Sequence, residues 1–224
     1  MSIKFKFKIP TSLHQTRQVR PRSKHHRPRS HLLRLNLRLN SSARSQINEI
    51  LRGLPQLSGG PICISSKAKL AANRGKLLFA YFEYGTPVYA ASFIRRREIV
   101  LERDLFGAGR TLRLIVVHEV FHFVWARLSN RARREFADLL LYEIGHRARG
   151  ELGESAGVKK NLLTAPEQSY NARLWRDYVC ESFCDTAAWF YSGVKHHKSF
   201  TLANRWSKRR QAWFQAAVGS CCNC

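Results

Sequence analysis

The chain has 224 residues, of which 44% are hydrophobic, and this is enough for one compact domain with a shielded core plus tails. Its 39 Lys and Arg against 15 acidic residues give a formal charge of +24, which favours contact with nucleic acid, anionic lipid or acidic partners. No apolar run approaches the roughly 20 residues that cross a bilayer, and nothing resembles a secretory signal, which argues against a transmembrane or secreted protein.

The first 48 residues carry twelve Lys or Arg and no acidic residue. With Pro21, Pro28 and no sustained apolar face, residues 1–45 are predicted to be a disordered basic arm. A solvated tail is the simplest interpretation, and an arm for nucleic acid or a membrane surface, or an organelle transit peptide, are the alternatives. The leucines between residues 32 and 39 could form a short strand or helix.

A single folded domain is expected over residues 46–220. It should begin with a short helix at 46–54 that Pro55 stops, and continue as a small sheet. In that sheet, two strands rich in aromatic and β-branched residues flank Gly85-Thr86-Pro87 as a hairpin, and a third strand follows. The expected strands cover residues 77–84, 88–94 and 98–105.

Helices are expected to make up the second half of the domain, with a loop at 149–166 where Gly and Glu are frequent. The first helix, with Thr111 as a candidate N-cap, is apolar on nearly every side and should lie in the core. The expected helices cover residues 112–128, 131–144, 171–191 and 202–218.

The six cysteines lack the even spacing of a secreted disulfide scaffold, so we expect a reducing compartment and a cytoplasmic protein. Three of them lie in a Cys-rich tail, residues 221–224, which has no second Cys pair to complete a zinc ribbon. An oxidation-prone tail is the simplest interpretation of this segment.

An H-E-x-x-H motif, His118-Glu119-Val120-Phe121-His122, lies within the first long helix. Residues four apart in a helix are stacked one turn above another, so both imidazoles can reach one Zn²⁺. Glu119 lies about 100° further round and can take a proton from a water activated at the metal. The neighbouring side chains are apolar, where unpaired polar groups are costly. Ordinary core histidines, hydrogen-bonded to their neighbours, are the alternative.

A zinc site needs a third protein ligand, and Glu181 is the candidate, with Asp185 one turn later. Both carboxylates interrupt an inward-facing stripe of the predicted helix. A metal for Glu181 and an imidazole N–H for Asp185 would satisfy both, and ion pairs with the abundant Arg are the alternative. His146 is the rival third ligand, although it follows a helix-ending Gly among arginines.

The combination of His118-Glu119-x-x-His122 with Glu181-x-x-x-Asp185 resembles the gluzincins, the thermolysin-like clan in which a Glu on a separate helix completes the metal site. Cys184-Asp185 and the long gap before Glu181 are more similar to membrane-associated gluzincins, including CAAX-processing and β-lactam-sensor proteases, than to thermolysin. The resemblance implies that Asp185 orients a metal-binding His, and that an edge strand, for which 98–105 is the candidate, pairs with extended substrate.

We therefore expect an α+β zincin-like domain with a small sheet, an active-site helix and a downstream glutamate helix. The expected activity is that of a zinc metallopeptidase with a peptide or protein substrate, in which His118, His122 and Glu181 hold Zn²⁺ and Glu119 is the general base. Candidates for oxyanion stabilisation are Tyr178, Tyr191, His196 and His197. The alternative from another class is a basic nucleic-acid-binding protein without catalytic activity.

Overall fold

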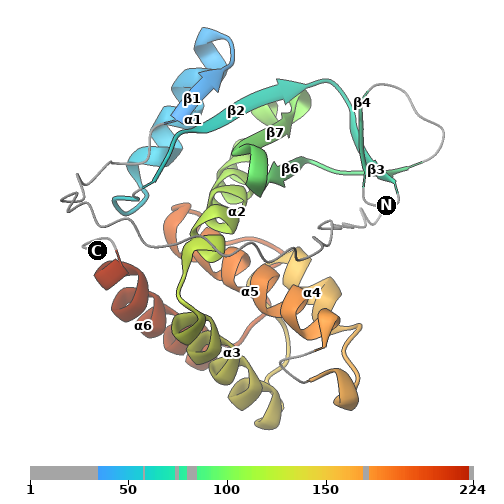
Figure 1. The fold of residues 1–224 in the computed structure, drawn as a ribbon, viewed down its shortest axis with the longest axis vertical. Coiled ribbons are helices and arrows are strands. Elements are labelled where there is room, and N and C mark those ends of the chain that lie inside the picture. Colours follow the sequence, from blue (N-terminus) through green and yellow to red (C-terminus); the bar gives the residue numbers. More distant parts are fainter. Residues whose placement is uncertain (1–34, 58, 74–75, 80–84, 169–171, 222–224) are drawn as a thin grey trace, which may run out of the picture.

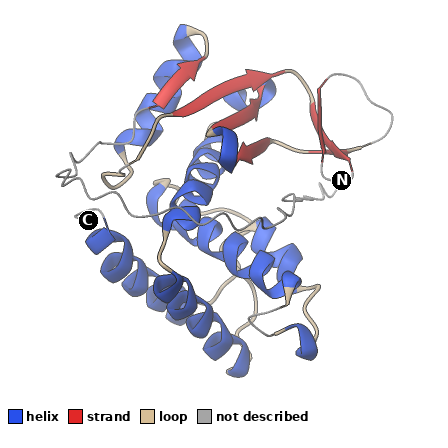
Figure 2. Cartoon of the chain, viewed as in Figure 1, coloured by secondary structure: helices blue, strands red, loops and turns tan. Residues whose placement is uncertain are grey.

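The computed structural model describes residues 35–57, 59–73, 76–79, 85–168 and 172–221, which form an α+β structure. Figure 1 shows the strands on one side of the molecule with helix α1 beside β1, helix α2 below them, and helices α3 to α6 beyond α2. The same division into a strand layer and a helical layer is visible by secondary structure in Figure 2. The expected α+β class is therefore confirmed.

The main sheet has four described strands in the order β1-β2-β7-β6. Strands β1 (Leu35–Arg38), β2 (Ile62–Lys67) and β7 (Glu98–Glu102) are parallel, whereas β6 (Ala90–Phe93) pairs antiparallel with β7. Three consecutive residues of β7 are buried, which is typical of an interior strand covered on both faces.

A smaller antiparallel sheet extends beside the main one, in the order β4-β3-β5. It consists of β3 (Leu70–Asn73), β4 (Lys76–Phe79) and the two-residue β5 (Thr86–Pro87). Leu70 and Val88 pack against Val100 of β7, and these apolar contacts join the two sheets.

The pairing of the strands differs from the expected hairpin of 77–84 with 88–94. Strand β4 pairs with β3, and β6 pairs with β7, while residues 80–84 lie outside the described part of the chain. The expected third strand ends at Glu102, where the 3₁₀ turn η2 (Arg103–Gly107) begins. Because β7 lies between β2 and β6, it is not the edge strand that we expected at 98–105, and β1 and β6 are the edge strands among the described ones.

The folded unit starts earlier than the expected boundary at residue 46. Strand β1 pairs with β2, and helix α1 runs over Ser41–Arg52 rather than 46–54. Asn40 caps this helix by accepting a hydrogen bond of 2.9 Å from the Ala43 N–H, and Ala43 is buried. Residues 35–45 are therefore part of the domain, and the expected arm at 1–34 lies outside the described residues.

The long helices lie close to their predicted positions. Helix α2 (Arg110–Arg127) contacts β6 on one side and α5 (Arg173–Tyr191) on the other. Helices α3 (Asn130–Gly145) and α6 (Asn204–Cys221) pack against α5. Gly109, and not Thr111, precedes α2 as its N-cap, without a side-chain hydrogen bond. The expected loop at 149–166 contains helix α4 (Glu154–Lys160) and ends within the short turn η3 (Ala165–Glu167).

An aromatic cluster fixes the relative positions of α2, α3, α5 and α6. Phe183 of α5 stacks on Phe214 of α6 with ring centroids 4.8 Å apart, and Phe136 of α3 meets Phe183 edge-on at 5.6 Å. Phe121, which lies within the H-E-x-x-H motif, stacks on Tyr191 at 5.3 Å. All four phenylalanines are fully buried, so the motif is embedded in the core of the helical layer.

A buried charge network lies next to the aromatic cluster, because Arg210 hydrogen-bonds Ser182, the neighbour of Phe183 on α5. The fully buried Arg210 of α6 binds the carboxylates of Glu143 and Glu151, with shortest distances of 2.6 and 2.7 Å. Glu151 also accepts a hydrogen bond of 2.6 Å from the Tyr178 hydroxyl. Burial alone would raise the pKa of Glu151, but the attraction to Arg210 has the larger effect. The pKa of Glu151 is therefore lowered, and its carboxylate stays ionised. The network joins α3, α5 and α6 to the segment before α4.

Among the described residues, no helix has both the length and the apolar composition that crossing a membrane requires.

Candidate metal centre

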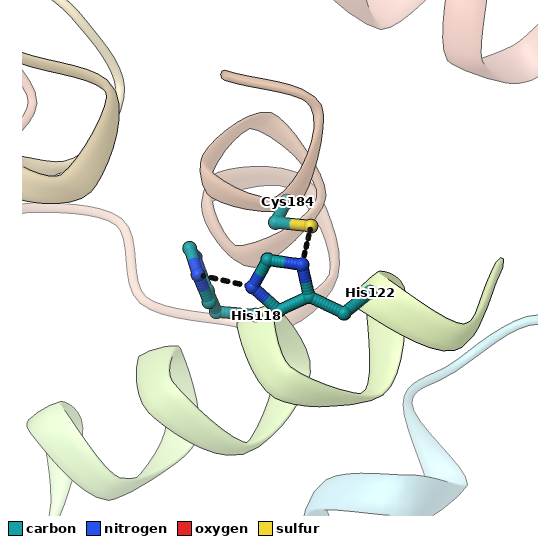
Figure 3. A group of neighbouring side chains, drawn as sticks. All are labelled: His118, His122 and Cys184. Carbon is teal, nitrogen blue, oxygen red and sulfur yellow. Dashed lines mark hydrogen bonds between the residues drawn. The ribbon is translucent and has the colours of Figure 1, made fainter. Parts of the chain in front are cut away.

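The two histidines of the motif lie on the face of α2 that meets α5. Both are buried, and their Nε2 atoms are 3.1 Å apart. Figure 3 shows the His122 ring between His118 of its own helix and Cys184 of α5. Successive turns of one helix thus direct two imidazole nitrogens to the same point, as the i, i+4 spacing predicts.

Asp185 binds the opposite nitrogen of His118. The His118 Nδ1–H donates a hydrogen bond of 2.8 Å to Asp185 Oδ1, and Nε2 of the same ring faces His122. The second oxygen of Asp185 accepts a hydrogen bond of 2.8 Å from the main-chain N–H of Ala156, in the first turn of α4. The imidazole partner that the sequence predicts for Asp185 is therefore present, and α4 holds the carboxylate from behind.

The backbone at Gly153 lies against the same carboxylate. A Cβ atom at this position would be 2.0 Å from Cγ of Asp185, far inside van der Waals contact. Only glycine fits there without moving either Asp185 or the segment before α4.

Glu181 lies beside His118, one turn before Asp185 on α5. Its Oε2 atom is 3.3 Å from His118 Nε2 and has no protein hydrogen bond of acceptable geometry. Leaving a buried carboxylate oxygen without a partner is costly, and none of the many arginines reaches it within the described part of the chain. The alternative interpretation, an ion pair with an arginine, therefore does not apply to Glu181 among these residues.

Two cysteines of α5 lie on the far side of the His122 ring. Cys184 Sγ is 3.4 Å and Cys180 Sγ 3.6 Å from His122 Nδ1. His118, His122 and Cys184 together form a buried group with donor atoms close enough to hold a metal. However, the thiol approaches Nδ1, whereas Nε2 of the same ring faces His118, and one ion cannot bind both nitrogens. We therefore regard Glu181 as the better partner for the two Nε2 atoms, and Cys184 as a partner of Nδ1.

The buried groups hold one another in charged forms. Burial alone would lower the pKa of His118, but the neighbouring carboxylates, first Asp185 and then Glu181, have the larger effect. The pKa of His118 therefore lies well above its usual value. At His122 burial is likewise outweighed by Cys180 and Glu181, which raises its pKa to about 9. Burial raises the pKa of Glu181, but His118 and His122 outweigh it and the pKa is lowered. The anionic partners therefore favour positive charge at the point where the Nε2 atoms meet.

Glu119 points away from the histidines, toward the sheet. Its Oε2 accepts a hydrogen bond of 2.5 Å from the hydroxyl of Ser92 on β6, and the same hydroxyl is 3.1 Å from the Glu119 carbonyl oxygen. Glu119 is 1% exposed, so the strand and the helix enclose the carboxylate between them. This contact anchors the candidate catalytic base to the edge strand.

A cavity of about 520 Å³ borders the site at His118 and Asp185. Its walls are formed by the first turns of α2, by α4, and by the segment between α5 and α6, which contributes His197. The Ser199 N–H and the Ser199 hydroxyl both approach Nδ1 of His197, at 3.3 and 2.6 Å. Because a main-chain N–H can only donate, Nδ1 is the acceptor, and in neutral His197 the proton is on Nε2.

The other predicted residues lie elsewhere. Tyr178 is bound to Glu151 in the buried charge network, and Tyr191 packs in the aromatic cluster. His146 is exposed at the end of α3, where its Nδ1–H donates to the Tyr142 carbonyl over 2.8 Å. His196 is exposed and does not line the cavity that reaches His118. Of the four candidates for oxyanion stabilisation, the structure brings only His197 to that cavity.

Sequence reasoning missed the residues that surround the predicted ones. Ser92 donates a hydrogen bond to Glu119, and the Cys180 thiol lies beside His122. Gly153, which has no side chain, leaves room for the Asp185 carboxylate. Cys180 and Cys184 are one helical turn apart and lie on either side of Glu181 in the sequence. This spacing is a signal that the sequence alone contains. Ser92 and Gly153 carry no such signal, because their roles depend on contacts across the fold.

No protein-family model matches the chain, and neither a curated protein nor a solved structure matches it.

Proposed function

We propose that the protein is a zinc-dependent hydrolase, and specifically a metallopeptidase with a zincin-like fold. The observation that carries this proposal is the position of His118 Nε2, which lies 3.1 Å from His122 Nε2 and 3.3 Å from Glu181 Oε2. Zinc bonds of about 2.0–2.2 Å in a tetrahedral site place two ligand atoms about 3.3–3.6 Å apart. The donor types fit zinc and the separation of His118 from Glu181 lies in this range, whereas the two Nε2 atoms would have to move slightly apart to bind the ion.

The buried Glu181 oxygen that has no hydrogen-bond partner is a second observation that fits a cation. Two nitrogen lone pairs and a carboxylate oxygen repel one another unless a proton or a metal lies between them. Asp185 supports the assignment because an imidazole that binds a metal through one nitrogen usually donates its other N–H to a carboxylate. His118, His122 and Glu181 would thus hold the metal, and Asp185 would orient His118.

Zinc bound there would supply a Lewis acid that lowers the pKa of water and polarises a peptide carbonyl. Glu119 accepts the proton of the attacking water on its carboxylate and passes it to the leaving amine nitrogen. For this step the side chain has to turn from Ser92 toward the metal or reach the water with its other oxygen. His197, with its proton on Nε2, donates a hydrogen bond to the developing oxyanion.

An extended substrate would pair with β6, an edge strand of the main sheet among the described strands. Ser92 lies on this strand and contacts Glu119 on α2, so a peptide added along β6 would pass near the base. The proposed substrate-binding strand is therefore Ala90–Phe93 instead of the expected 98–105.

Two measurements test the proposal on the full-length protein. Metal analysis after purification and after zinc titration should give about one zinc per chain, and His118→Ala and His122→Ala should each lose it. Glu119→Gln should retain the zinc and lose essentially all peptide hydrolysis, because the ligands remain while the proton acceptor is removed. A protein that binds no zinc, or a Glu119→Gln variant with undiminished hydrolysis, would contradict the proposal.

A further inference from the structure

A second hollow opens beside the cavity at His118. It lies between the start of α2 and the segment that joins α5 to α6, and has a volume of about 570 Å³. We call it the basic recess, because four of its six lining residues are basic. The lining residues are Ala108, Arg110, Thr111, His196, His197 and Lys198.

The lining of the recess contains no acidic side chain. Arg110, His196 and Lys198 form no ion pair within the described part of the chain, although Glu154, which lines the adjoining cavity, interacts electrostatically with Lys198. Burial lowers the pKa of His197, and Lys198 and Arg110 lower it further, which indicates that these positive charges act on the same small volume. A concave surface on which cations converge and outnumber the nearby acidic side chains favours an anionic ligand.

The recess continues into the cavity at the candidate metal centre. Thr111, His197 and Lys198 line both hollows, and His118 lines the cavity. Thr111 and His118 lie seven residues apart on α2, which corresponds to about 10 Å along a helix axis. An extended peptide covers this distance in about three residues.

We propose that the basic recess binds a carboxylate of the substrate, carried by an Asp or Glu about three residues from the bond that is cleaved. This inference rests on the proposed peptidase function, because only a bond at the metal centre defines that spacing. Arg110 and Lys198 supply the full charges, and His197 connects the recess to the reacting carbonyl. The preferred substrates are therefore acidic peptide segments.

The cleavage test uses peptides from a proteome digest and full-length enzyme. Mass spectrometry of the products should show Asp and Glu enriched two to four residues from the cleaved bond, on one side of it. Matched peptides with Glu or Gln at that position should differ in kcat/KM by about fivefold for each cation engaged. The ratio of kcat/KM for the Glu peptide to that for the Gln peptide should fall to near one in the Arg110→Gln/Lys198→Gln double variant. The ratio should be unchanged in the matched control Arg134→Gln/Lys208→Gln, whose exposed cations lie on α3 and α6.

A binding test separates this inference from the proposed activity. Fluorescence anisotropy with a labelled decapeptide containing two Glu, against the same peptide with two Gln, should show tighter binding of the Glu peptide. That difference should weaken with salt and vanish in the Arg110→Gln/Lys198→Gln variant alone. If the Glu preference in binding depends on these cations but no peptide is cleaved, binding of carboxylates by the basic recess is supported and the proposed peptidase function is contradicted. Cleavage without acidic enrichment, or an acidic preference that survives in the double variant, overturns the recess.

Discussion

The hydroxyl of Ser92 on strand β6 donates a 2.5 Å hydrogen bond to Oε2 of Glu119 on helix α2. It connects the strand along which a substrate would lie with the carboxylate that would act on it. A carboxylate held at one oxygen has fewer orientations to lose when the reaction begins. Ser92 is therefore a positioning residue in the proposed mechanism.

We predict that Ser92→Ala lowers kcat of peptide hydrolysis by about 10–100-fold while zinc content stays at one per chain. Ser92→Thr retains the hydroxyl and suits a strand, so it should recover most of the activity. Steady-state kinetics and metal analysis of the two variants provide the test. A Ser92→Ala enzyme with normal kcat would show that the contact has no part in positioning Glu119.

The close approach of Gly153 to Asp185 makes a second prediction. Gly153→Ala introduces a Cβ that would lie 2.0 Å from Asp185 Cγ, so the carboxylate must shift away from His118. We expect zinc affinity to fall by about 10–100-fold, as for loss of the Asp185 contact itself. Gly157→Ala is the matched control, because a Cβ there meets no atom within 4 Å. Equal zinc affinity of the two variants, measured with a competing chelator, would refute this role.

The third metal ligand can be identified by substitution. Glu181→Ala should abolish stoichiometric zinc binding, whereas Cys184→Ala should keep it, because the thiol faces Nδ1 of His122 and not Nε2. His146→Ala should also keep it, since His146 lies exposed at the end of α3. Zinc titration is the measurement, and Co²⁺ substitution adds an absorption band if a thiolate is bound. If the Cys184→Ala variant bound no zinc and the Glu181→Ala variant still bound it, Cys184 and not Glu181 would be the third ligand.

The buried charge network predicts a large cost for losing its cation. Arg210→Met would leave Glu143 and Glu151 buried without their shared partner. Removing one member of a buried ion pair typically destabilises a protein by about 3–5 kcal/mol. Urea unfolding of this variant should show a loss of that order, and Lys208→Met, at an exposed position of the same helix, should be nearly neutral. Similar midpoints for both variants would be inconsistent with a structural role for Arg210.

The earlier start of the domain gives a fifth prediction. Deleting residues 1–45 removes β1 and the cap and first turn of α1, including the buried Ala43. Deleting residues 1–34 removes none of the described elements. The longer deletion should therefore lower the thermal unfolding temperature well below that of the shorter one, as followed by circular dichroism. Equal unfolding temperatures would restore the boundary at residue 46.

The helices were predictable because their signal is local. The apolar repeat of α2, α3, α5 and α6 is contained within each segment, so their positions follow from the sequence to within a few residues. Helix α4 was missed because Gly157 and its polar start suggest a loop. Its first turn is held instead by a long-range hydrogen bond from Ala156 N–H to Asp185.

The sheet was harder to predict because strand pairing is not local. Residues 77–94 contain strand-forming segments, but nothing within them indicates that β4 returns to β3 or that β6 pairs with β7. Parallel pairing of β1 and β2 brings together segments separated by the whole of α1. The histidine pair of the site follows from helical spacing, whereas Ser92 and Gly153 are brought to it by these distant pairings and turns.

The donors of the candidate centre come from two helices, and His118 and Asp185 are separated by 67 residues of chain. An ion bound between these helices would act as a removable cross-link between α2 and α5. It would bind the native state and not the unfolded chain, so a free ion concentration 1,000 times the dissociation constant would add about 4 kcal/mol to the free energy of unfolding. The melting temperature would then report metal occupancy directly, and a chelator would loosen the contact between the two helices as it emptied the site.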